Sequence, residues 1–326
     1  MAHHAEKIAN VLRDIPHAGF TVEPTPIYRL NSISHSLARN IFVLREDMTG
    51  FGLGGNKVRK LDYLIADAVS KGADTLVTSI ASSFSRNAAP AATARGLDLH
   101  VILNGSEHDH NPLSRSFFER FQTTLHYVDA PSQEDFTRSQ QNIIEDIRSR
   151  GRNVYEMPPG GSTEIGTLGY IRVFEQIARY SESTGTCFDK IVLPTGSAGT
   201  QAGLVLAQCI SEYATEIIGV AISKPADVQH ERVRKLAEST ATMLGTDLDD
   251  SNVLVDDRFL GEGYPIPSPE SAEAASLFAQ SEGILLDLIY GGKAAAWLQN
   301  AAATGEIDAA ETVLFIHTGG NGGIFY

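Results

Sequence analysis

Cysteine is scarce in this chain, which has only Cys187 and Cys209 among 326 residues. Neither has a cysteine or histidine partner at metal-binding spacing, so we expect no disulfide framework and no metal site. Long apolar runs are also missing, and residues 1–7 lack the apolar core of a secretory signal. We therefore expect no membrane span and a cytoplasmic location, with His3 and His4 in a flexible terminus rather than at a metal.

Positive charge is in the minority, since 26 lysines and arginines face 40 aspartates and glutamates, for a net charge of -14. No long basic run occurs, which argues against nucleic acid and against anionic membranes as partners. The chain does have 42% hydrophobic and 20% charged residues, which is typical of a globular protein with a well-buried core. Its length fits one large domain or two ordinary ones.

Strand-like and helix-like segments alternate along most of the chain. Short β-rich runs such as 75–80 and 190–193 are each followed by a segment with helical spacing, for example 87–95, in which Pro90 is expected close to the helix start. This rhythm predicts an α/β protein with open, mostly parallel sheets and right-handed crossovers. The proline-glycine break at 158–161 indicates where the chain passes from one sheet to the other. Ligands are expected at the carboxyl ends of the strands.

The sequence Gly-Gly-Asn-Lys-Val-Arg-Lys at 54–60 predicts the start of a helix. Asn56 is expected as the N-cap, apolar residues then recur at helical spacing, and Gly72 supplies a stop. Lys57 would then lie in the first turn, where the positive end of the helix dipole disfavours an ammonium and lowers the pKa of the amine. Since only a neutral amine attacks a carbonyl, Lys57 is a candidate nucleophile. A pair of solvated surface lysines is the alternative.

A second loop, Thr-Gly-Ser-Ala-Gly-Thr at 195–200, follows a strand and opens a helix. Its small residues expose successive amides, its hydroxyls add donors, and the helix dipole favours a dianion, so the loop is typical of a phosphate cradle. It lacks the lysine and the spacing of a nucleotide P-loop, and it does not fit the dinucleotide fingerprint. A tight turn with a capping threonine is the alternative.

Three further kinds of loop carry candidate ligand groups. Thr318 follows the last predicted strand and precedes two glycines, so its hydroxyl is placed to bond a heteroatom of a flat ring. The serine-rich loop at 79–87 precedes a helix start, whose amides are suited to holding a carboxylate. Tyr264 and Tyr290 each neighbour glycine or proline and are candidate proton donors or stacking partners. The alternatives are a terminal turn, an N-cap box and core packing, respectively.

A lysine able to form a Schiff base, a phosphate cradle and a hydroxyl for a ring nitrogen are together the handles of pyridoxal phosphate. From about residue 26 to its end, the chain resembles the pyridoxal-phosphate enzymes of the tryptophan-synthase β-like fold, called fold type II. Within them it is similar to the branch of 1-aminocyclopropane-1-carboxylate deaminase, D-cysteine desulfhydrase and L-cysteate sulfo-lyase. The motifs that carry the resemblance occur in order and are GGNKVRK, PGGSTEIGTLGY, TGSAGTQAG and HTGG.

The resemblance implies a role for each matching residue. Lys57 would be the Schiff-base lysine and the base that moves the α proton, and Thr318 would face the pyridine nitrogen. A hydroxyl at that position leaves the ring nitrogen largely unprotonated, which suits elimination. The implied catalytic partners of Lys57 are Tyr264, Tyr290 and Ser82. The implied substrate contacts are Ser82, Ser83, Phe84 and Gly161. The implied cofactor contacts besides Lys57 and Thr318 are Lys60, Ser83, Thr195, Gly196, Ser197, Ala198, Gly199 and Thr200.

The substrate pocket departs from the family pattern in two places. The family's Gln-Ser-Asn followed by His or Gln is here Ala-Ser-Ser-Phe at 81–84. Ser83 is therefore too short to reach the cofactor's 3' oxygen as an asparagine does, and Phe84 has no hydrogen-bonding side chain. Gly291 stands where the deaminases carry glutamate and the desulfhydrases commonly carry threonine. The missing carboxylate argues against cyclopropane ring opening, so we expect intact cofactor machinery and a remodelled substrate pocket.

These inferences predict a pyridoxal-phosphate-dependent lyase or deaminase that performs α,β-elimination on a small amino acid, giving a keto acid and ammonia, in the manner of D-cysteine desulfhydrase. Two alternatives stay open: β-replacement, racemisation or a specialised biosynthetic step on a modified amino acid, and a non-catalytic sensor of the cofactor or an amino acid. The resemblance also implies a homodimer with the active site in a cleft between two domains. The larger, cofactor-binding domain would comprise 1–56 and 162–326, and the smaller would comprise 57–161.

Overall fold

The computed structural model describes residues 3–320 and contains two separate sheets. The larger sheet has the strand order β1-β2-β10-β7-β8-β9 and is parallel except for the β1–β2 pair. The smaller sheet is parallel throughout and has the order β5-β4-β3-β6. The strands are β1 (Ile27–Arg29), β2 (Asn40–Arg45), β3 (Thr75–Ser79), β4 (Asp98–Asn104), β5 (Thr124–Val128), β6 (Val154–Glu156), β7 (Lys190–Thr195), β8 (Glu216–Ala221), β9 (Leu254–Asp256) and β10 (Thr312–His317).

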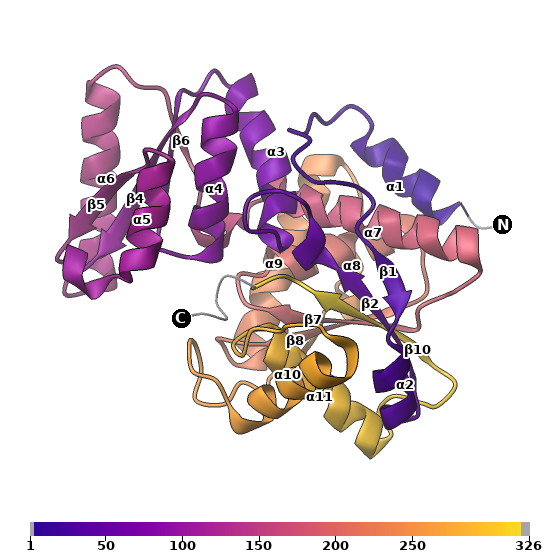
Figure 1. Ribbon diagram of the computed structural model, residues 1–326. Coiled ribbons are helices and arrows are strands. Elements are labelled where there is room, and N and C mark those ends of the chain that lie inside the picture. The colour runs from indigo at the N-terminus through magenta and orange to yellow at the C-terminus, as the bar shows by residue number, and fades with distance from the viewer. Residues whose placement is uncertain (1–2, 321–326) are drawn as a thin grey trace.

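Helices cover both sheets, and the two parts of the molecule lie side by side in Figure 1. One face of the larger sheet packs on α1, α7, α8 and α9, and the other face packs on α2, α10 and α11. The helices are α1 (His4–Leu12), α2 (Asn31–Leu37), α3 (Asn56–Ser70), α4 (Ser83–Ala94), α5 (Pro112–Arg120), α6 (Gln133–Ser149), α7 (Glu164–Thr184), α8 (Gly199–Ser211), α9 (Ala226–Leu244), α10 (Pro269–Glu282) and α11 (Gly291–Thr304).

The central strand β10 illustrates why the larger sheet forms. Its residues Val313, Leu314, Phe315 and Ile316 are all fully buried, because both faces of a parallel sheet are covered. Leu314 and Ile316 join the core under α7 and α8, whereas Val313 and Phe315 join the core under α10 and α11. Successive side chains of β10 therefore alternate between the two cores. They do not alternate between buried and exposed positions.

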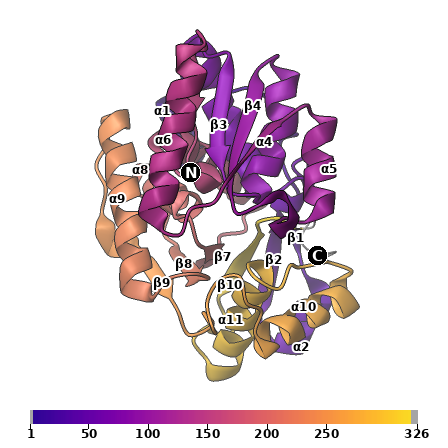
Figure 2. The same ribbon diagram turned by 90° about the vertical axis from the view of Figure 1, so that its left-hand side faces the viewer.

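Helix α3 joins the two parts. Leu61 and Leu64 belong to the core of the smaller part, while the opposite side of the helix packs on α7. Gly169 of α7 permits this contact, since a Cβ there would lie 2.3 Å from the carbonyl oxygen of Arg59. Figure 2 shows the smaller sheet above the larger one. The residues that begin α3 are consequently held between the two sheets.

Two local predictions are wrong. Helix α4 begins at Ser83 instead of residue 87, because Ser82 and Ser85 form a capping box in which the Ser82 amide donates to Ser85 Oγ at 2.9 Å. Pro90 therefore lies inside the helix and not near its start. His4 is not in a flexible terminus, since it begins α1 and its Nδ1 lies 2.6 Å from the Ser211 carbonyl oxygen.

Some short elements have no counterpart in the sequence pattern. Strands β1 and β9 and helix α2 were not predicted, because three to seven residues are too few to display a clear period. Between residues 3 and 320, no helix is long and apolar enough to cross a membrane. The same residues hold no group of three or more potential metal-binding side chains, and Cys187 and Cys209 are free thiols.

Candidate active site

The amine of Lys57 lies beside the turn that contains Gly160. A Cβ on Gly160 would be 3.8 Å from Lys57 Nζ and only 2.7 Å from Ser197 Oγ, so the absence of a side chain lets three segments meet at this point. The φ of Gly160 is 78°, a left-handed conformation that favours glycine. The tertiary structure thus brings the lysine helix, the proline-glycine turn and the predicted phosphate loop together.

Burial sets the chemistry of Lys57. Nζ has no hydrogen-bond acceptor among the residues that the structure describes. Its surroundings remove water from the ammonium and lower the pKa from 10.5 to about 8. The direction agrees with the prediction, and its cause here is burial. At pH 7 roughly a tenth of such an amine is neutral and able to attack a carbonyl.

Asn56 connects the lysine to two other predicted residues. Gly55, with φ 91°, is the N-cap of α3, so the prediction that Asn56 caps the helix is wrong. The Asn56 amide donates to the Thr318 carbonyl oxygen at 2.8 Å, and Asn56 Nδ2 donates to Thr200 Oγ1 at 2.9 Å. The asparagine side chain therefore bonds a neighbouring loop, and it fixes the start of α3 against that loop.

Lys60 places a second amine at the start of α8. The residue is fully buried, and Nζ donates to the Gly160 carbonyl at 3.2 Å and to Ser162 Oγ at 3.0 Å. A Cβ on Gly199 would lie 2.8 Å from Lys60 Nζ. Burial, and then the charge of Lys57, hold the pKa of Lys60 well below its ordinary value. A dianion at this helix N-terminus would raise the pKa of Lys60 again, because an opposite charge favours the ammonium.

Ser162 is a site residue that no individual prediction named, although it lies in the quoted PGGSTEIGTLGY motif. Its Oγ donates to Ser197 Oγ at 2.9 Å and accepts from the Gly199 amide at 3.3 Å. Ala198, between those two residues, has φ 72° and ψ -41°, a conformation that L-residues adopt at a cost of about 1–3 kcal/mol. Strain of this kind is typical of loops that hold a ligand.

The outer side of the same loop is anchored to α9. Thr195 Oγ1 accepts from Gln229 Nε2 at 2.9 Å, and the Gly196 carbonyl accepts from Arg232 Nη1 at 3.1 Å. A Cβ on Gly196 would come within 3.8 Å of Tyr290 Cε1. The predicted phosphate loop therefore lies beside one of the two predicted tyrosines.

Tyr264 and Tyr290 lie together, as the resemblance implies. Their rings meet edge to face with centroids 6.0 Å apart. Burial first, and then the neighbouring Tyr264, raise the pKa of Tyr290 far above its ordinary value, so its hydroxyl stays protonated at neutral pH. The Asp287 carboxylate, which no prediction named, accepts the amides of Ile289, Tyr290 and Gly291 at 3.0, 2.7 and 3.1 Å. Asp287 thereby orients the turn that carries Tyr290.

The predicted carboxylate loop splits between cleft and core. Ser82 is the N-cap of α4, and its Oγ accepts the Ser85 amide at 3.5 Å, so its hydroxyl hydrogen stays available. Ser83 is exposed. The Phe84 ring is fully buried in the smaller core instead of the cleft, and a Cβ on Gly161 would lie 2.4 Å from Phe84 Cε2. Phe84 and Gly161 therefore pack on each other.

Asn87 ties this loop to the glycine hairpin before Lys57. Its Nδ2 donates to the carbonyls of Gly54 and Ser83 at 3.1 and 3.0 Å, and its Oδ1 accepts the Leu53 amide at 2.8 Å. No sequence motif marks the contacts of Asn87 with the hairpin, because Leu53 and Gly54 lie more than thirty residues away in the chain.

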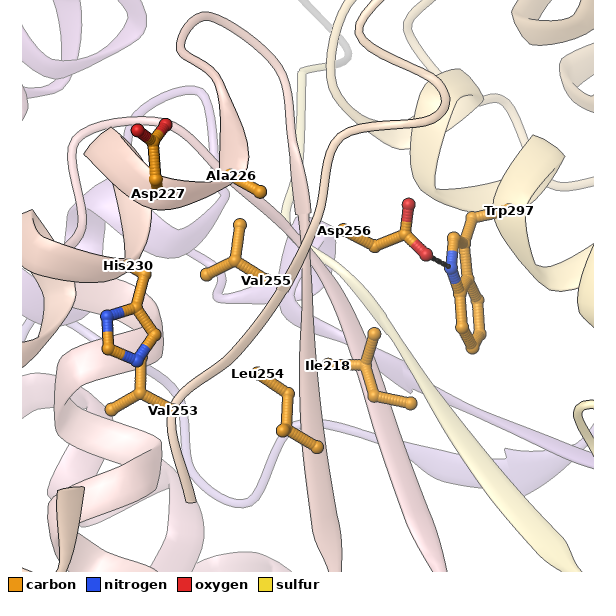
Figure 3. A pocket seen from close by; sticks show the side chains of 9 residues that line it. All are labelled: Ile218, Ala226, Asp227, His230, Val253, Leu254, Val255, Asp256 and Trp297. Atoms are coloured by element: carbon orange, nitrogen blue, oxygen red, sulfur yellow. Dashed lines mark hydrogen bonds between the residues drawn. The ribbon is translucent and has the colours of Figure 1, made fainter. Parts of the chain in front are cut away.

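A separate open cavity of about 460 Å³ lies at the edge of the larger sheet, between α9 and α11 (Figure 3). His230 and Trp297 line it from opposite sides of β9, and Trp297 Nε1 donates to Asp256 Oδ2 at 2.8 Å. It shares no residue with the site around Lys57. The cavity is therefore not part of the candidate active site, which is defined by the side chains and glycines that meet around Lys57.

Comparison with known proteins identifies the family. The model of the family described as pyridoxal-phosphate dependent enzyme matches residues 19–319. This chain belongs to that family. It is 36% identical over 322 residues, 98% of this chain and 96% of the relative, to a Pyrococcus horikoshii protein named "Putative 1-aminocyclopropane-1-carboxylate deaminase". It is 35% identical over 323 residues, 96% of each chain, to the D-cysteine desulfhydrase of Serratia proteamaculans.

A solved structure extends the comparison to the fold. A protein described as an ACC deaminase homologue is 34% identical and has a TM-score of 0.88, covering 97% of this chain and 95% of its own. The predicted fold class, with two open and mostly parallel sheets flanked by helices, is confirmed. The predicted use of pyridoxal phosphate is confirmed by the family.

The residues present fit this cofactor. Bare glycine backbone at Gly160 and Gly199 leaves room where a Cβ would collide with Ser197 or Lys60. Lys60 and the N-terminus of α8 together suit a phosphate, and the half-buried Lys57 beside them has an amine with a lowered pKa. The chain therefore supplies an anion site and a carbonyl-reactive amine side by side.

Proposed function

We propose that this protein is a lyase that performs α,β-elimination on a small amino acid and releases a keto acid and ammonia. The observation that carries the proposal is the placement of Lys57 Nζ against Gly160 and the 195–200 loop. Lys57 is half-buried, its amine has a lowered pKa, and it has no acceptor among the described residues. The names of the relatives, a deaminase and a D-cysteine desulfhydrase, support the reaction class.

Each residue of the site would have a role that suits its side-chain chemistry. Lys60, with the amides of residues 196–200, would hold the phosphate, and the Thr318 hydroxyl would bond the ring nitrogen. When bound, pyridoxal phosphate supplies an electron sink for charge that develops at the substrate α carbon. Lys57 would hold the cofactor and then, as a free amine, take the α proton.

The substrate would be held from both sides of the cleft. The Ser82 hydroxyl and the exposed amides at the start of α4 would bind its carboxylate, because a helix N-terminus favours an anion. The hydroxyl of Tyr290 or of Tyr264 beside it would donate a proton to the leaving group.

Covalent trapping tests the role of Lys57. The purified protein is expected to be yellow, and borohydride reduction followed by peptide mapping should place the cofactor on Lys57. The matched variant K60M keeps the nucleophile and removes the phosphate contact, so it should still be trapped at Lys57 but bind the cofactor more weakly. Recovery of the adduct on another lysine, or a colourless protein that refuses added cofactor, would refute the proposal.

Product analysis tests the reaction. A panel of D- and L-amino acids with β leaving groups, including cysteine and cysteate, should yield keto acid and ammonia in equal amounts with at least one member. The K57A variant should yield neither. Release of ammonia without keto acid would contradict the elimination.

The placement of Ser83 and Phe84 favours a second candidate. Phe84 packs in the core and Ser83 is short and exposed, whereas the family pattern that this loop resembles has asparagine followed by histidine or glutamine here, so we infer more space beside Ser83. A β-replacement, a racemisation or a specialised step on a modified amino acid would use that space. Adding a thiol nucleophile to the panel and resolving the enantiomers of the product would distinguish these outcomes from elimination. A sensor without turnover would instead give a spectrum that shifts with an amino acid and never returns.

Quaternary structure, location and domain limits also belong to the proposal. We expect a homodimer, to be measured by light scattering, and a cytoplasmic protein. The division into residues 1–56 with 162–326 and residues 57–161 agrees with the strand content of the two sheets.

A further inference from the structure

Lys293 is a fully buried lysine that the proposed reaction does not use. It lies on α11, three residues after Tyr290 and therefore on the same side of the helix. Its Nζ donates to the carbonyl oxygen of Leu260 at 2.7 Å and to that of Gly263 at 3.2 Å. Among the described residues no carboxylate pairs with it.

This placement is energetically unfavourable on two counts. An ammonium without a counter-charge loses its hydration when it is buried, and burial lowers the pKa of Lys293 accordingly. The amine also lies near the N-terminus of α11, where the helix dipole disfavours a positive charge. A methionine or leucine would fill the space without either cost, so the two hydrogen bonds are what the lysine contributes.

The loop that Lys293 contacts carries Tyr264. The backbone hydrogen bonds inside this loop are local, since Gly263 donates to Leu260 at 3.2 Å and Ile266 donates to Gly263 at 3.0 Å. The side chain of Tyr264 is 51% exposed, so packing does little to hold it. In the part of the chain that the structure describes, the hydrogen bonds from another element to carbonyls 260 and 263 come from Lys293.

We propose that Lys293 is a positioning residue that holds Tyr264 against Tyr290 by anchoring the two carbonyls that precede it. Helix α11 then sets both tyrosines: Tyr290 lies at its N-terminus, where Asp287 orients the turn, and Tyr264 is held through Lys293 one turn further on. The catalytic consequence rests on the proposed function, whereas the anchoring itself does not.

Hydrogen exchange tests the anchoring without any substrate. In holoenzyme carrying K293M, the amides of residues 257–268 should exchange about tenfold faster than in the unchanged protein, because the loop opens more often. K293R retains donors and should restore most of the protection. The control K190M removes another buried lysine, which pairs with Glu216 and Glu311 far from this loop, and should leave the exchange of residues 257–268 unchanged. Equal protection in K293M and the unchanged protein would overturn the proposal.

A double-mutant comparison tests the catalytic consequence. K293M should lower kcat about tenfold with an unaltered cofactor spectrum, and the combination with Y264F should be within about twofold of Y264F alone, because Lys293 acts through Tyr264. Fully additive losses would show that Lys293 acts elsewhere and would refute the assignment. If K293M does not fold, K293Q, which is neutral and shorter, replaces it with the same expected directions. If no amino acid is turned over, the proposed function fails while the exchange result still decides the anchoring.

Discussion

The backbone amide of Asn56 donates a hydrogen bond to the carbonyl oxygen of Thr318, with 2.8 Å between the two atoms. Lys57 follows Asn56 directly, so this bond couples the proposed nucleophile to the residue expected to face the pyridine nitrogen. Two glycines permit the contact. A Cβ on Gly319 would lie 2.5 Å from the Cα of Gly55, and one on Gly55 would lie 2.9 Å from the Thr318 oxygen.

G319A should therefore separate the two loops. The added Cβ meets backbone, which has no rotamer with which to move away, so cofactor affinity should fall at least about tenfold and stability should fall by about 1–3 kcal/mol. G305A is the control, because Gly305 also has positive φ but a Cβ there would meet nothing within 4 Å. It should change stability only through local strain and leave cofactor titration unchanged. Equal cofactor affinity in G319A and G305A would show that separating the two loops does not weaken cofactor binding, contrary to this prediction.

The pH dependence of cofactor capture should report the pKa of Lys57. Burial lowers this pKa to about 8, and only the neutral amine attacks an aldehyde. The rate constant for cofactor capture by the apo protein should rise with pH and reach half its maximum near pH 8. Stopped-flow absorbance measures it, with K57A as the blank. A midpoint close to the ordinary lysine value of 10.5 would contradict the assigned environment.

The buried ion pair between Arg59 and Glu46 should stabilise the start of α3. Arg59 Nε and Nη2 donate to the two carboxylate oxygens at 3.0 and 2.9 Å, and both side chains are almost inaccessible. E46Q leaves the guanidinium with only the partly exposed Glu23 as its counter-charge and should lower the free energy of unfolding by up to about 3–5 kcal/mol. D146N removes an exposed partner of Arg150 and should have almost no effect. Urea unfolding of the apo proteins compares them, and equal midpoints would be contrary to expectation.

His100 and His126 should make the smaller part sensitive to acid. Their rings stack, with Nδ1 of His100 2.8 Å from Nε2 of His126, and burial lowers the pKa of both. The unfolded chain therefore binds more protons, so stability is present above the unfolded pKa of about 6.5 and is lost as the pH falls below it. The charged groups that also act on the pair are Asp98, Asp146, Arg150 and Arg152.

The comparison variant for this prediction is H100Q. It removes one of the two titrating rings, so the fall in melting temperature between pH 7 and pH 5 should become shallower than in the unchanged protein. An identical slope in both proteins would show that other groups dominate the acid response.

Much of the fold follows from local pattern. The apolar period after Lys57 predicts α3, and the β-rich run at 190–193 predicts β7, which continues to Thr195. Both elements are long enough for their period to be recognised, and each buries a continuous apolar surface. Helix α4 was misplaced because its start depends on a serine capping box whose hydroxyls also suit a loop, and Pro90 masked the helical spacing.

The residues of the candidate site can be divided in the same way, into those that local sequence predicts and those that it does not. Glycines, hydroxyls and the lysine occur in contiguous motifs, so their chemical types were readable together with the expected cofactor. Ser162, Asn87 and Lys293 were not, because they contact groups that tertiary packing brings near from distant parts of the chain. Asp287 contacts only the turn that follows it, but no motif marked that turn. The burial of Phe84 against Gly161 has the same origin.

The amino-acid sequence by itself predicted an α/β protein with two mostly parallel sheets. It also predicted a lysine, an anion loop and two tyrosines that suit pyridoxal phosphate. Periodicity and turn chemistry act over a few residues, so they can be read without a fold. The tertiary structure alone decided that Asn56 bonds Thr318 and Thr200 instead of capping its helix, that the Lys57 pKa falls through burial, and that Phe84 enters the core. Those outcomes depend on which distant backbones approach closely enough to exclude water.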